Sequence, residues 1–287
     1  MVPRRSPKSE PQLRIGAHVG GGLAGHVDRA KKSGADTIQI FASNPRGWAE
    51  ISVNEAADAA FRERMEKAGI GPLFIHAPYL VNIASPNLEF IAKSIKNASW
   101  TMQRAQSLGA AGVIVHAGAA GPGVARADAL ARAAASLLLI LESTETPFLV
   151  VELTAGGSNT IASAWPMAAE LLDACDAHGR IRFCFDTCHA HAAGYDLSNK
   201  VGTDACWAEL DRDIGIDRLR VVHANDSRDA SGSRRDRHAH IGDGTIGEDG
   251  FGALLSHEFA RRVPWIVETP PTRQPEDIAR LRALANA

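Results

Sequence analysis

The sequence lacks the features of a membrane or disulfide-bonded protein. No apolar run approaches the roughly 20 residues that a transmembrane helix needs. The first twelve residues are polar and proline-rich, without the apolar stretch of a signal peptide. Only four cysteines are present, and no two of them form a CxxC pair. We therefore expect no disulfide framework and no membrane partner, and a reducing cytoplasm is the favoured location.

An excess of basic residues is missing as well, because the formal net charge is −2. This balance does not exclude nucleic acid as a partner, since affinity depends on a local basic patch, and metal-binding carboxylates also count as negative here. The 287 residues suit one large α/β domain or two small ones. We expect a flexible tail at residues 1–12 and a single domain at residues 13–287.

Eight short apolar runs bounded by turn signals predict β-strands. They lie at residues 13–19, 37–42, 73–77, 113–117, 148–153, 181–186, 219–224 and 265–268. Most are nearly continuous in Val, Ile, Leu and Phe, which is typical of parallel strands buried on both faces. Stretches of helical period, such as residues 88–108 and 127–141, separate them. Eight strands alternating with helices over about 250 residues predict an α/β fold, a single (β/α)8 TIM barrel.

An open doubly wound sheet is the alternative fold. Such a sheet would favour a glycine-rich phosphate loop after its first strand. The glycine triplet at residues 20–22 lacks the GxGxxG spacing and the later acidic partner of that motif. The sequence therefore favours the barrel.

Side chains that bind metals end seven of the eight predicted strands. In chain order they are His18, His76, His116, Glu152, Asp186 with His189 just beyond it, His223 and Glu268. In a (β/α)8 barrel the C-terminal strand ends meet at one mouth, which carries the chemistry of such enzymes. A charge at the end of a buried strand is costly unless it is paired or binds a metal. One such residue could be a structural histidine, but seven together predict a metal site.

The long loop after the seventh predicted strand adds Asp236 and His238 as candidate ligands. One intervening residue lets both side chains reach one ion, but DxH alone is a weak motif, and His240 offers a second imidazole. Imidazole and carboxylate ligands suit zinc, manganese or iron. The histidines in stretches of helical period are expected on the surface: His26, His178 and His257.

The better candidates are five histidines and four carboxylates, which are too many for one tetrahedral zinc. They suffice for two or three ions if a carboxylate bridges. Three divalent ions would outweigh four carboxylates, and a positive site attracts a phosphodiester and stabilises the charge of its transition state. A sugar isomerase would need one or two ions. The number of ligands therefore favours phosphate chemistry.

Six segments resemble the endonuclease IV family along nearly the whole chain. They are IHAPYLVNIASP (75–86), VIVHAG (113–118), ELTAG (152–156), FDTCHAHAAGYD (185–196), HANDSRDASGSRRDRHAHIGDGTIG (223–247) and VET (267–269). The patterns DTCHxxxAGYD and NDSxxxxGSxxDRHxxIGxG are long and specific. The resemblance implies a (β/α)8 barrel with three zinc ions, for which manganese could substitute. It also implies cleavage of duplex DNA 5′ to abasic sites, leaving a 3′-hydroxyl, and trimming of blocked 3′ ends.

The ligand pattern of the family falls on nine residues of this chain. By resemblance, His76, His116 and Glu152 would hold the first ion, Glu152, Asp186, His223 and Glu268 the second, and His189, Asp236 and His238 the third. Glu152 and Glu268 would be the catalytic carboxylates. His18 and His240 would then not be ligands.

The resemblance also implies DNA contacts at the barrel mouth. The loop SNPRGW (43–48) matches a family loop, so Asn44 and Arg46 would contact DNA near the lesion, and Tyr79 would help to hold the duplex open. Arg237, in an arginine-rich loop, would contact phosphates. One departure is Leu153, where many members of the family have asparagine.

Two other functions stay open. A metal-dependent sugar isomerase or epimerase on the same barrel would explain some ligands, but not the DRH motif or the arginine-rich loop. A non-catalytic DNA-binding barrel would be expected to lose ligands, and all nine are present. We expect a monomeric enzyme that acts on double-stranded DNA with abasic or 3′-blocked sites, associated with the nucleoid in a prokaryote.

Overall fold

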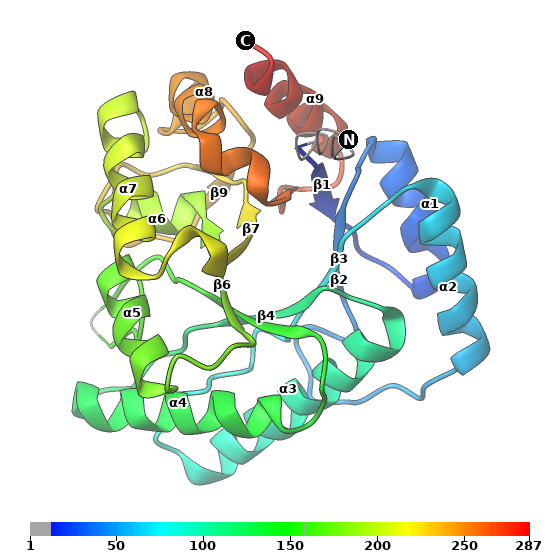
Figure 1. Cartoon of the computed structure of the whole chain (residues 1–287), viewed down its shortest axis with the longest axis vertical. Helices are drawn as coiled ribbons and strands as arrows, with labels where there is room; N and C mark the ends of the chain where they lie inside the picture. The colour runs from blue at the N-terminus through cyan, green and yellow to red at the C-terminus, as the bar shows by residue number, and fades with distance from the viewer. Residues whose placement is uncertain (1–12, 158) are drawn as a thin grey trace, which may run out of the picture.

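Eight parallel strands close into a barrel in the computed structural model, which describes residues 13–157 and 159–287 (Figure 1). The barrel strands are β1 (Ile15–His18), β2 (Ile38–Phe41), β3 (Leu73–His76), β4 (Gly112–His116), β5 (Phe148–Glu152), β6 (Ile181–Asp186), β7 (Leu219–His223) and β10 (Trp265–Val267). They follow one another around the barrel in chain order, and β10 closes it against β1. The predicted (β/α)8 barrel is confirmed and the open sheet is excluded. The predicted tail at residues 1–12 lies outside the described residues.

Helices form the outer ring. They are α1 (Leu23–Ser33), α2 (Glu55–Ala68), α3 (Leu88–Leu108), α4 (Arg126–Leu141), α5 (Trp165–Ala174), α7 (Lys200–Asp213), α8 (Gly247–Ser256) and α9 (Gln274–Ala285), with the short α6 (Thr187–Ala193) directly after β6. Local sequence sets several of their ends. The side chains of Asn54, Asn87 and Asn199 accept a backbone N–H at the start of α2, α3 and α7. Each of these caps satisfies a donor that the first helical turn leaves free.

The barrel interior positions the ends of the strands. Its core consists of Phe74, Ile114, Val150, Cys184, Val221 and Ile266, one from each of six strands. Successive side chains of a strand point to opposite faces, so the residue two positions further on points into the barrel as well. In all six strands that residue is a predicted metal ligand: His76, His116, Glu152, Asp186, His223 and Glu268. The alternation of the strands therefore places six ligands at one mouth, directly above six apolar interior residues.

Three histidines differ from their predicted places. His26 was expected on the surface, but it is only 2% exposed and its ring lies 6.4 Å from that of Phe61. It shares the inward face of α1 with Val27 and Ala30. His178 and His257 are partly buried and lie outside the helices. Among the described residues, no helix combines the length and apolar character that crossing a membrane requires.

Candidate metal centre

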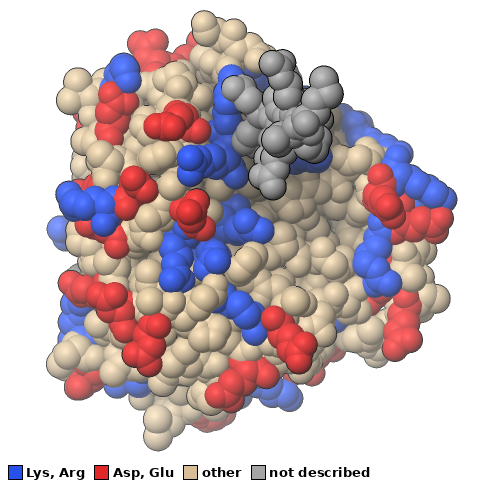
Figure 2. Space-filling view, in the orientation of Figure 1, with Lys and Arg blue, Asp and Glu red and all other residues tan. Residues whose placement is uncertain are grey.

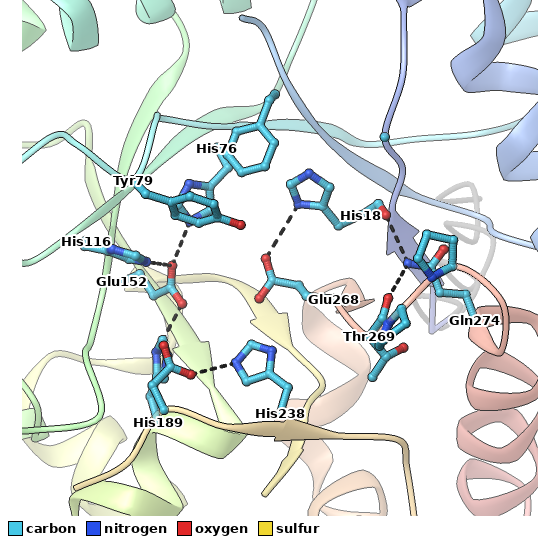
Figure 3. Close-up of a pocket in the computed structure, with 15 residues that line it drawn as sticks. His18, His76, Tyr79, His116, Glu152, His189, His238, Glu268, Thr269 and Gln274 are labelled. Atoms are coloured by element: carbon cyan, nitrogen blue, oxygen red, sulfur yellow. Dashed lines mark hydrogen bonds and ion pairs between the residues drawn. The ribbon is translucent and has the colours of Figure 1, made fainter. Parts of the chain in front are cut away.

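Seven of the nine predicted ligands line a cavity of about 610 Å³ in the C-terminal mouth of the barrel (Figure 3), and the other two, Asp186 and His223, are buried beside them. The donor atoms of the nine fall into groups in which every atom lies within 4.8 Å of the others. Three of these groups are His76, His116 and Glu152; Glu152, Asp186, His223 and Glu268; and His189, Asp236 and His238. They are the three sets that the family resemblance implied, and Glu152 belongs to two of them. The arrangement can bind metal ions at adjacent positions.

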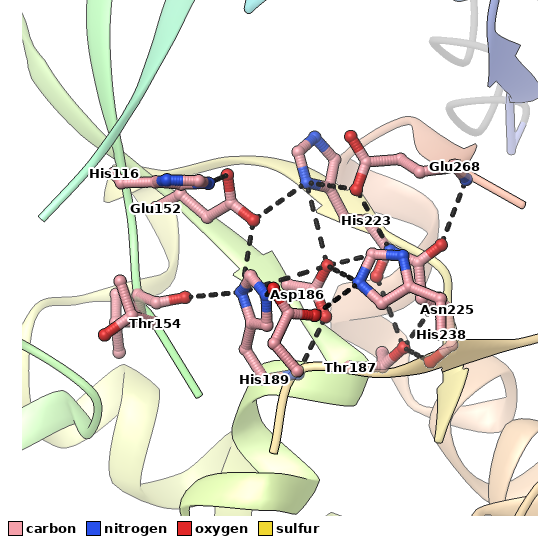
Figure 4. A network of polar contacts seen from close by, with 12 residues as sticks. His116, Glu152, Thr154, Asp186, Thr187, His189, His223, Asn225, His238 and Glu268 are labelled. Atoms are coloured by element: carbon pink, nitrogen blue, oxygen red, sulfur yellow. Dashed lines mark hydrogen bonds and ion pairs between the residues drawn. The ribbon is translucent and has the colours of Figure 1, made fainter. Parts of the chain in front are cut away.

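Glu152 is the central carboxylate of this cluster, and it is 1% exposed. Its Oε2 lies 3.1 Å from Nε2 of His76 and 3.4 Å from Nε2 of His116. Its Oε1 lies 3.2 Å from Nδ1 of both His189 and His223 (Figure 4). The two oxygens thus face different pairs of imidazoles. This is the geometry of a carboxylate that could bridge two cations.

The charges of the cluster depend on one another. Burial alone would raise the pKa of Glu152, but His223, His116 and His189 hold it well below its usual range. Burial lowers the pKa of His189, but Asp186, Asp236 and Glu152 raise it well above its usual value. The carboxylates therefore favour positive charge next to them, which a proton on an imidazole or a bound divalent cation can supply.

The loop after β7 brings Asp236 and His238 back across the mouth, and a buried carboxylate shapes it. The strands β8 (Asp226–Ser227) and β9 (His238–Ala239) pair antiparallel within this loop. The carboxylate of Asp226 accepts backbone N–H groups at 2.7–3.4 Å from Ser227, Gly242, Gly244, Ile246 and Gly247. Gly244 has to be glycine, because a Cβ there would lie 2.3 Å from Oδ1 of Asp226.

Asp277 on α9 is a second carboxylate that fixes segments around the site, after Asp226. Its carboxylate accepts hydrogen bonds from Nδ1 of His240 at 2.7 Å, from the backbone N–H of Ile241 at 3.0 Å and from Oγ1 of Thr269 at 2.6 Å. His240 follows His238 by two residues, and Thr269 follows Glu268. One buried carboxylate therefore ties two ligand-bearing segments to the same helix. His240 itself lies outside the three groups of ligands.

His238 tests whether the donors fit a metal. Its Nε2 is buried and makes no hydrogen bond within the described residues. The same atom lies 3.1 Å from Oδ1 of Asp236 and 3.7 Å from Oδ2 of Asp186. An imidazole nitrogen placed among carboxylate oxygens without a hydrogen bond suits a shared cation. The set of imidazole and carboxylate donors fits zinc.

Sequence reasoning missed two residues that fix the ligands. Gln39 of β2 is fully buried; its Nε2 donates to Oε1 of Glu268 at 2.6 Å, and its Oε1 accepts from Nε2 of His223 at 2.8 Å. Asn225 is also fully buried, and its Nδ2 donates to Asp186 at 2.7 Å and to Glu268 at 3.1 Å. Gln39 is a polar residue inside the apolar run at residues 37–42, and this was the signal that could have indicated its role. Such outer contacts orient metal ligands.

Comparisons with known proteins agree with this geometry. A family model described as a xylose isomerase-like TIM barrel matches residues 27–284. A probable endonuclease 4 of Methanoculleus marisnigri is 41% identical over 281 residues, which cover 95% of this chain and 99% of that protein. A probable endonuclease 4 of Streptomyces coelicolor is 38% identical, with 97% of each chain covered. The crystal structure of endonuclease IV from Thermus thermophilus matches with a TM-score of 0.85 and 34% identity, over 95% of this chain and 99% of that chain.

This chain belongs to the endonuclease IV family. The predicted resemblance is confirmed, and the protein is an enzyme of the deoxyribonuclease IV class, a phosphoric diester hydrolase. A D-tagatose 3-epimerase-like protein also matches, with a TM-score of 0.73 but only 18% identity, which shows a shared fold alone. Family membership therefore decides between the two enzyme classes that the sequence left open.

The residues expected to contact DNA lie on loops of this endonuclease IV barrel. Oδ1 of Asn44 accepts the backbone N–H of Arg46 at 3.0 Å, and the backbone N–H of Tyr79 donates to the carbonyl of Pro45 at 3.0 Å. The Tyr79 side chain lines the cavity although Tyr79 is 56% exposed, and its ring stacks 6.4 Å from that of His116. These contacts hold the loop at residues 43–48 beside the metal centre.

Arg237 lies in the loop that carries Asp236 and His238. Its Nε donates to Oδ2 of Asp229 at 2.6 Å, and its side chain is 52% exposed. The ion pair orients the guanidinium without covering it. Leu153, the departure from the family pattern, contributes its backbone carbonyl, which accepts from Nδ1 of His189 at 2.9 Å. That contact does not depend on the side chain at position 153.

Proposed function

We propose that this protein cuts duplex DNA on the 5′ side of abasic sites, leaves a 3′-hydroxyl and trims blocked 3′ ends, with three zinc ions bound. The observation that carries the proposal is the set of three adjacent donor groups, two of which share Glu152, at one open cavity. His76, His116 and Glu152 would hold one ion, Glu152, Asp186, His223 and Glu268 a second, and His189, Asp236 and His238 a third. Manganese could substitute for zinc.

Bound zinc supplies Lewis acidity that polarises the phosphate and lowers the pKa of water. The chain contributes orientation. Gln39 and Asn225 each donate one N–H to a different oxygen of Glu268, which fixes the plane of that carboxylate beside the cavity. Burial and the nearby Glu268 and Glu152 raise the pKa of Tyr79, so its hydroxyl stays protonated and can donate a hydrogen bond. Together these groups hold a phosphodiester in one orientation.

The protein would select abasic sites largely because DNA that lacks a base is easier to deform. Bending DNA and extruding a nucleotide cost a few kcal/mol, and less where the base is already missing. Tyr79 lines the cavity that an extruded sugar would enter. Arg46 would contact DNA near the lesion, and Arg237 would contact the backbone. We expect the protein to act as a monomer in the cytoplasm, next to the nucleoid of a prokaryote.

A single incision assay tests the proposal. A duplex with one abasic-site analogue should be nicked on the 5′ side without added magnesium, whereas the matched intact duplex should not. Prolonged treatment with a strong chelator should abolish nicking and zinc should restore it, because the site carries its own zinc ligands. Metal analysis of the purified protein should give close to three zinc ions per chain. Full activity in rigorously metal-free protein would contradict the mechanism.

Recognition can be separated from chemistry by replacing Arg46 and Tyr79 together with alanine. Neither residue belongs to a donor group, so bound zinc and folding should be unchanged. Affinity for abasic duplex should fall by a few kcal/mol, the scale of the stacking energies at stake. Affinity for intact duplex, set mainly by phosphate contacts, should change much less. Binding curves on both duplexes at two salt concentrations measure this, and equal weakening of both would show ordinary backbone contacts.

A further inference from the structure

The N-terminal mouth of the barrel, opposite the metal centre, carries a group of arginines. Arg182 is the second residue of β6 and Arg220 the second residue of β7, while Arg261 and Arg262 lie in the short helix η2 (Glu258–Arg262) that precedes β10. Arg14 immediately precedes β1. Figure 2 shows blue side chains gathered around the middle of the face at which the barrel strands begin. Function in such barrels lies at the other mouth, so this concentration of charge needs an explanation.

The arginines here differ in how their donors are used. Nη1 of Arg14 donates to the carbonyls of Asp36, Gly69 and Gly71 at 2.8–3.3 Å, so Arg14 stabilises the adjoining turns. Arg220, in contrast, makes no hydrogen bond or ion pair through its guanidinium within residues 13–157 and 159–287. Its Cζ lies 4.6 Å from the ring centroid of Phe148, and Cζ of Arg182 lies 4.6 Å from the same centroid.

The guanidinium groups of Arg261 and Arg262 also have N–H donors without a partner among the described residues. In the described chain, Arg261 makes one side-chain hydrogen bond, at 3.3 Å to the carbonyl of Ala285. Nη1 of Arg262 lies 3.7 Å from Oδ1 of Asp217, whose side chain is 99% exposed to water. A pair so exposed contributes little. Both guanidiniums are therefore free to bind another acceptor.

A cavity of about 220 Å³ is lined by Arg220, Arg261 and Arg262, together with Arg14 and apolar residues, and none of the described residues that line it carries a carboxylate. Burial lowers the pKa of Arg220, which reflects the cost of placing its charge in a partly enclosed position. The cavity is smaller than the roughly 300–1,000 Å³ of sites for drug-sized ligands. Its size suits a single small oxyanion.

We propose that this cavity binds a phosphate-type oxyanion, held by Arg220, Arg261 and Arg262 at the end of the barrel opposite the metal centre. Planar guanidinium groups match the oxygens of phosphate geometrically and stay charged at every physiological pH. An anion at this place would supply the acceptor that the guanidinium of Arg220 lacks among the described residues. The site accepts either free phosphate or the terminal phosphate of a nucleic acid, and the two sources can be told apart.

Thermal unfolding of the full chain with its metal bound tests the site. Potassium phosphate, compared with potassium chloride at equal ionic strength, should raise the Tm of the parent. Phosphate at ten times its Kd should add about 3 °C from this site. Arg220→Met keeps the packing on Phe148 but removes the charge, and it should lose that increment. Arg212→Met, on the exposed side of α7, should keep it.

Phosphate can also reach the metal centre, so a second readout separates the two places. Inhibition of nicking by phosphate reports on the metal centre and should be the same in Arg220→Met and the parent. If Arg220→Met does not fold, the double variant Arg261→Gln and Arg262→Gln should show the same loss of the Tm increment. An equal phosphate-dependent rise of Tm in the parent and in these variants would overturn the site.

Thermal unfolding in the presence of lesion-free duplexes shows whether the site binds free phosphate or the terminal phosphate of a nucleic acid. A larger Tm rise with a 5′-phosphorylated duplex than with the same duplex carrying a 5′-hydroxyl, lost in Arg220→Met, assigns the site to nucleic-acid ends. A rise that inorganic phosphate alone produces assigns it to the free anion. If a duplex with a 5′-hydroxyl end stabilises the protein as much as the phosphorylated one, and inorganic phosphate does nothing, the arginines attract polyanions in general and the site is overturned.

Discussion

Glu152→Gln is expected to lower the rate of nicking by about 10³-fold, the range found when a group that stabilises transition-state charge is removed. The carboxylate faces four imidazoles at 3.1–3.4 Å, two on each oxygen. Glutamine keeps the shape, but one oxygen becomes an amide NH₂ that cannot accept a proton or bind a cation. The variant loses a negative charge that two donor groups share. We therefore expect both lower activity and fewer than three bound metal ions.

Single-turnover nicking of an abasic duplex and metal analysis of the same preparation measure the two effects together. Glu170→Gln is the matched control, because Glu170 lies on α5 and pairs with Arg126 outside the barrel. The control should keep the parent's rate and metal content. If Glu152→Gln also kept both, Glu152 would be a structural carboxylate that needs no cation.

The strands and the six inward ligands could be predicted because both follow from local pattern. Apolar runs define the strands, and alternation places His76 or Glu152 two residues beyond an interior residue. Gln39 and Glu268 could not be paired in this way, since 229 positions separate them in the chain. The same holds for the bond of Asp277 to His240. Local sequence does not specify contacts that only closure of the barrel creates.

The loop after β7 shows a second limit of the sequence. Its motif indicated Asp236 and His238 as ligands, but nothing in the pattern indicated that Asp226 would organise the loop by accepting five backbone N–H groups. His26 shows the reverse case. The prediction that placed this histidine on the surface was wrong, and its spacing of four residues from Ala30 on α1 was the available signal for the inward face.

Glu268 ends the eighth barrel strand, and Glu268→Gln should separate catalysis from binding. Its side chain is 16% exposed, against 1% for Glu152, so it borders the open part of the cavity. Oε1 accepts from Gln39 and Oε2 from Asn225. Glutamine has only one acceptor oxygen, so its NH₂ group would oppose one of these donors. The substitution thus removes a charge and disturbs the orientation of the group that remains.

We expect Glu268→Gln to lower the nicking rate by at least about 10²-fold, the scale on which changes at metal ligands and their partners act. Binding of abasic duplex should persist, because Arg46, Tyr79 and Arg237 are unchanged. Two of the three donor groups do not contain Glu268, so those ions should stay bound. Single-turnover rates, metal content and binding curves, with Glu276→Gln on the exposed side of α9 as control, give the three readouts. Nearly normal turnover would show that Glu268 only supports the fold, whereas loss of binding in parallel with rate would place it in DNA recognition.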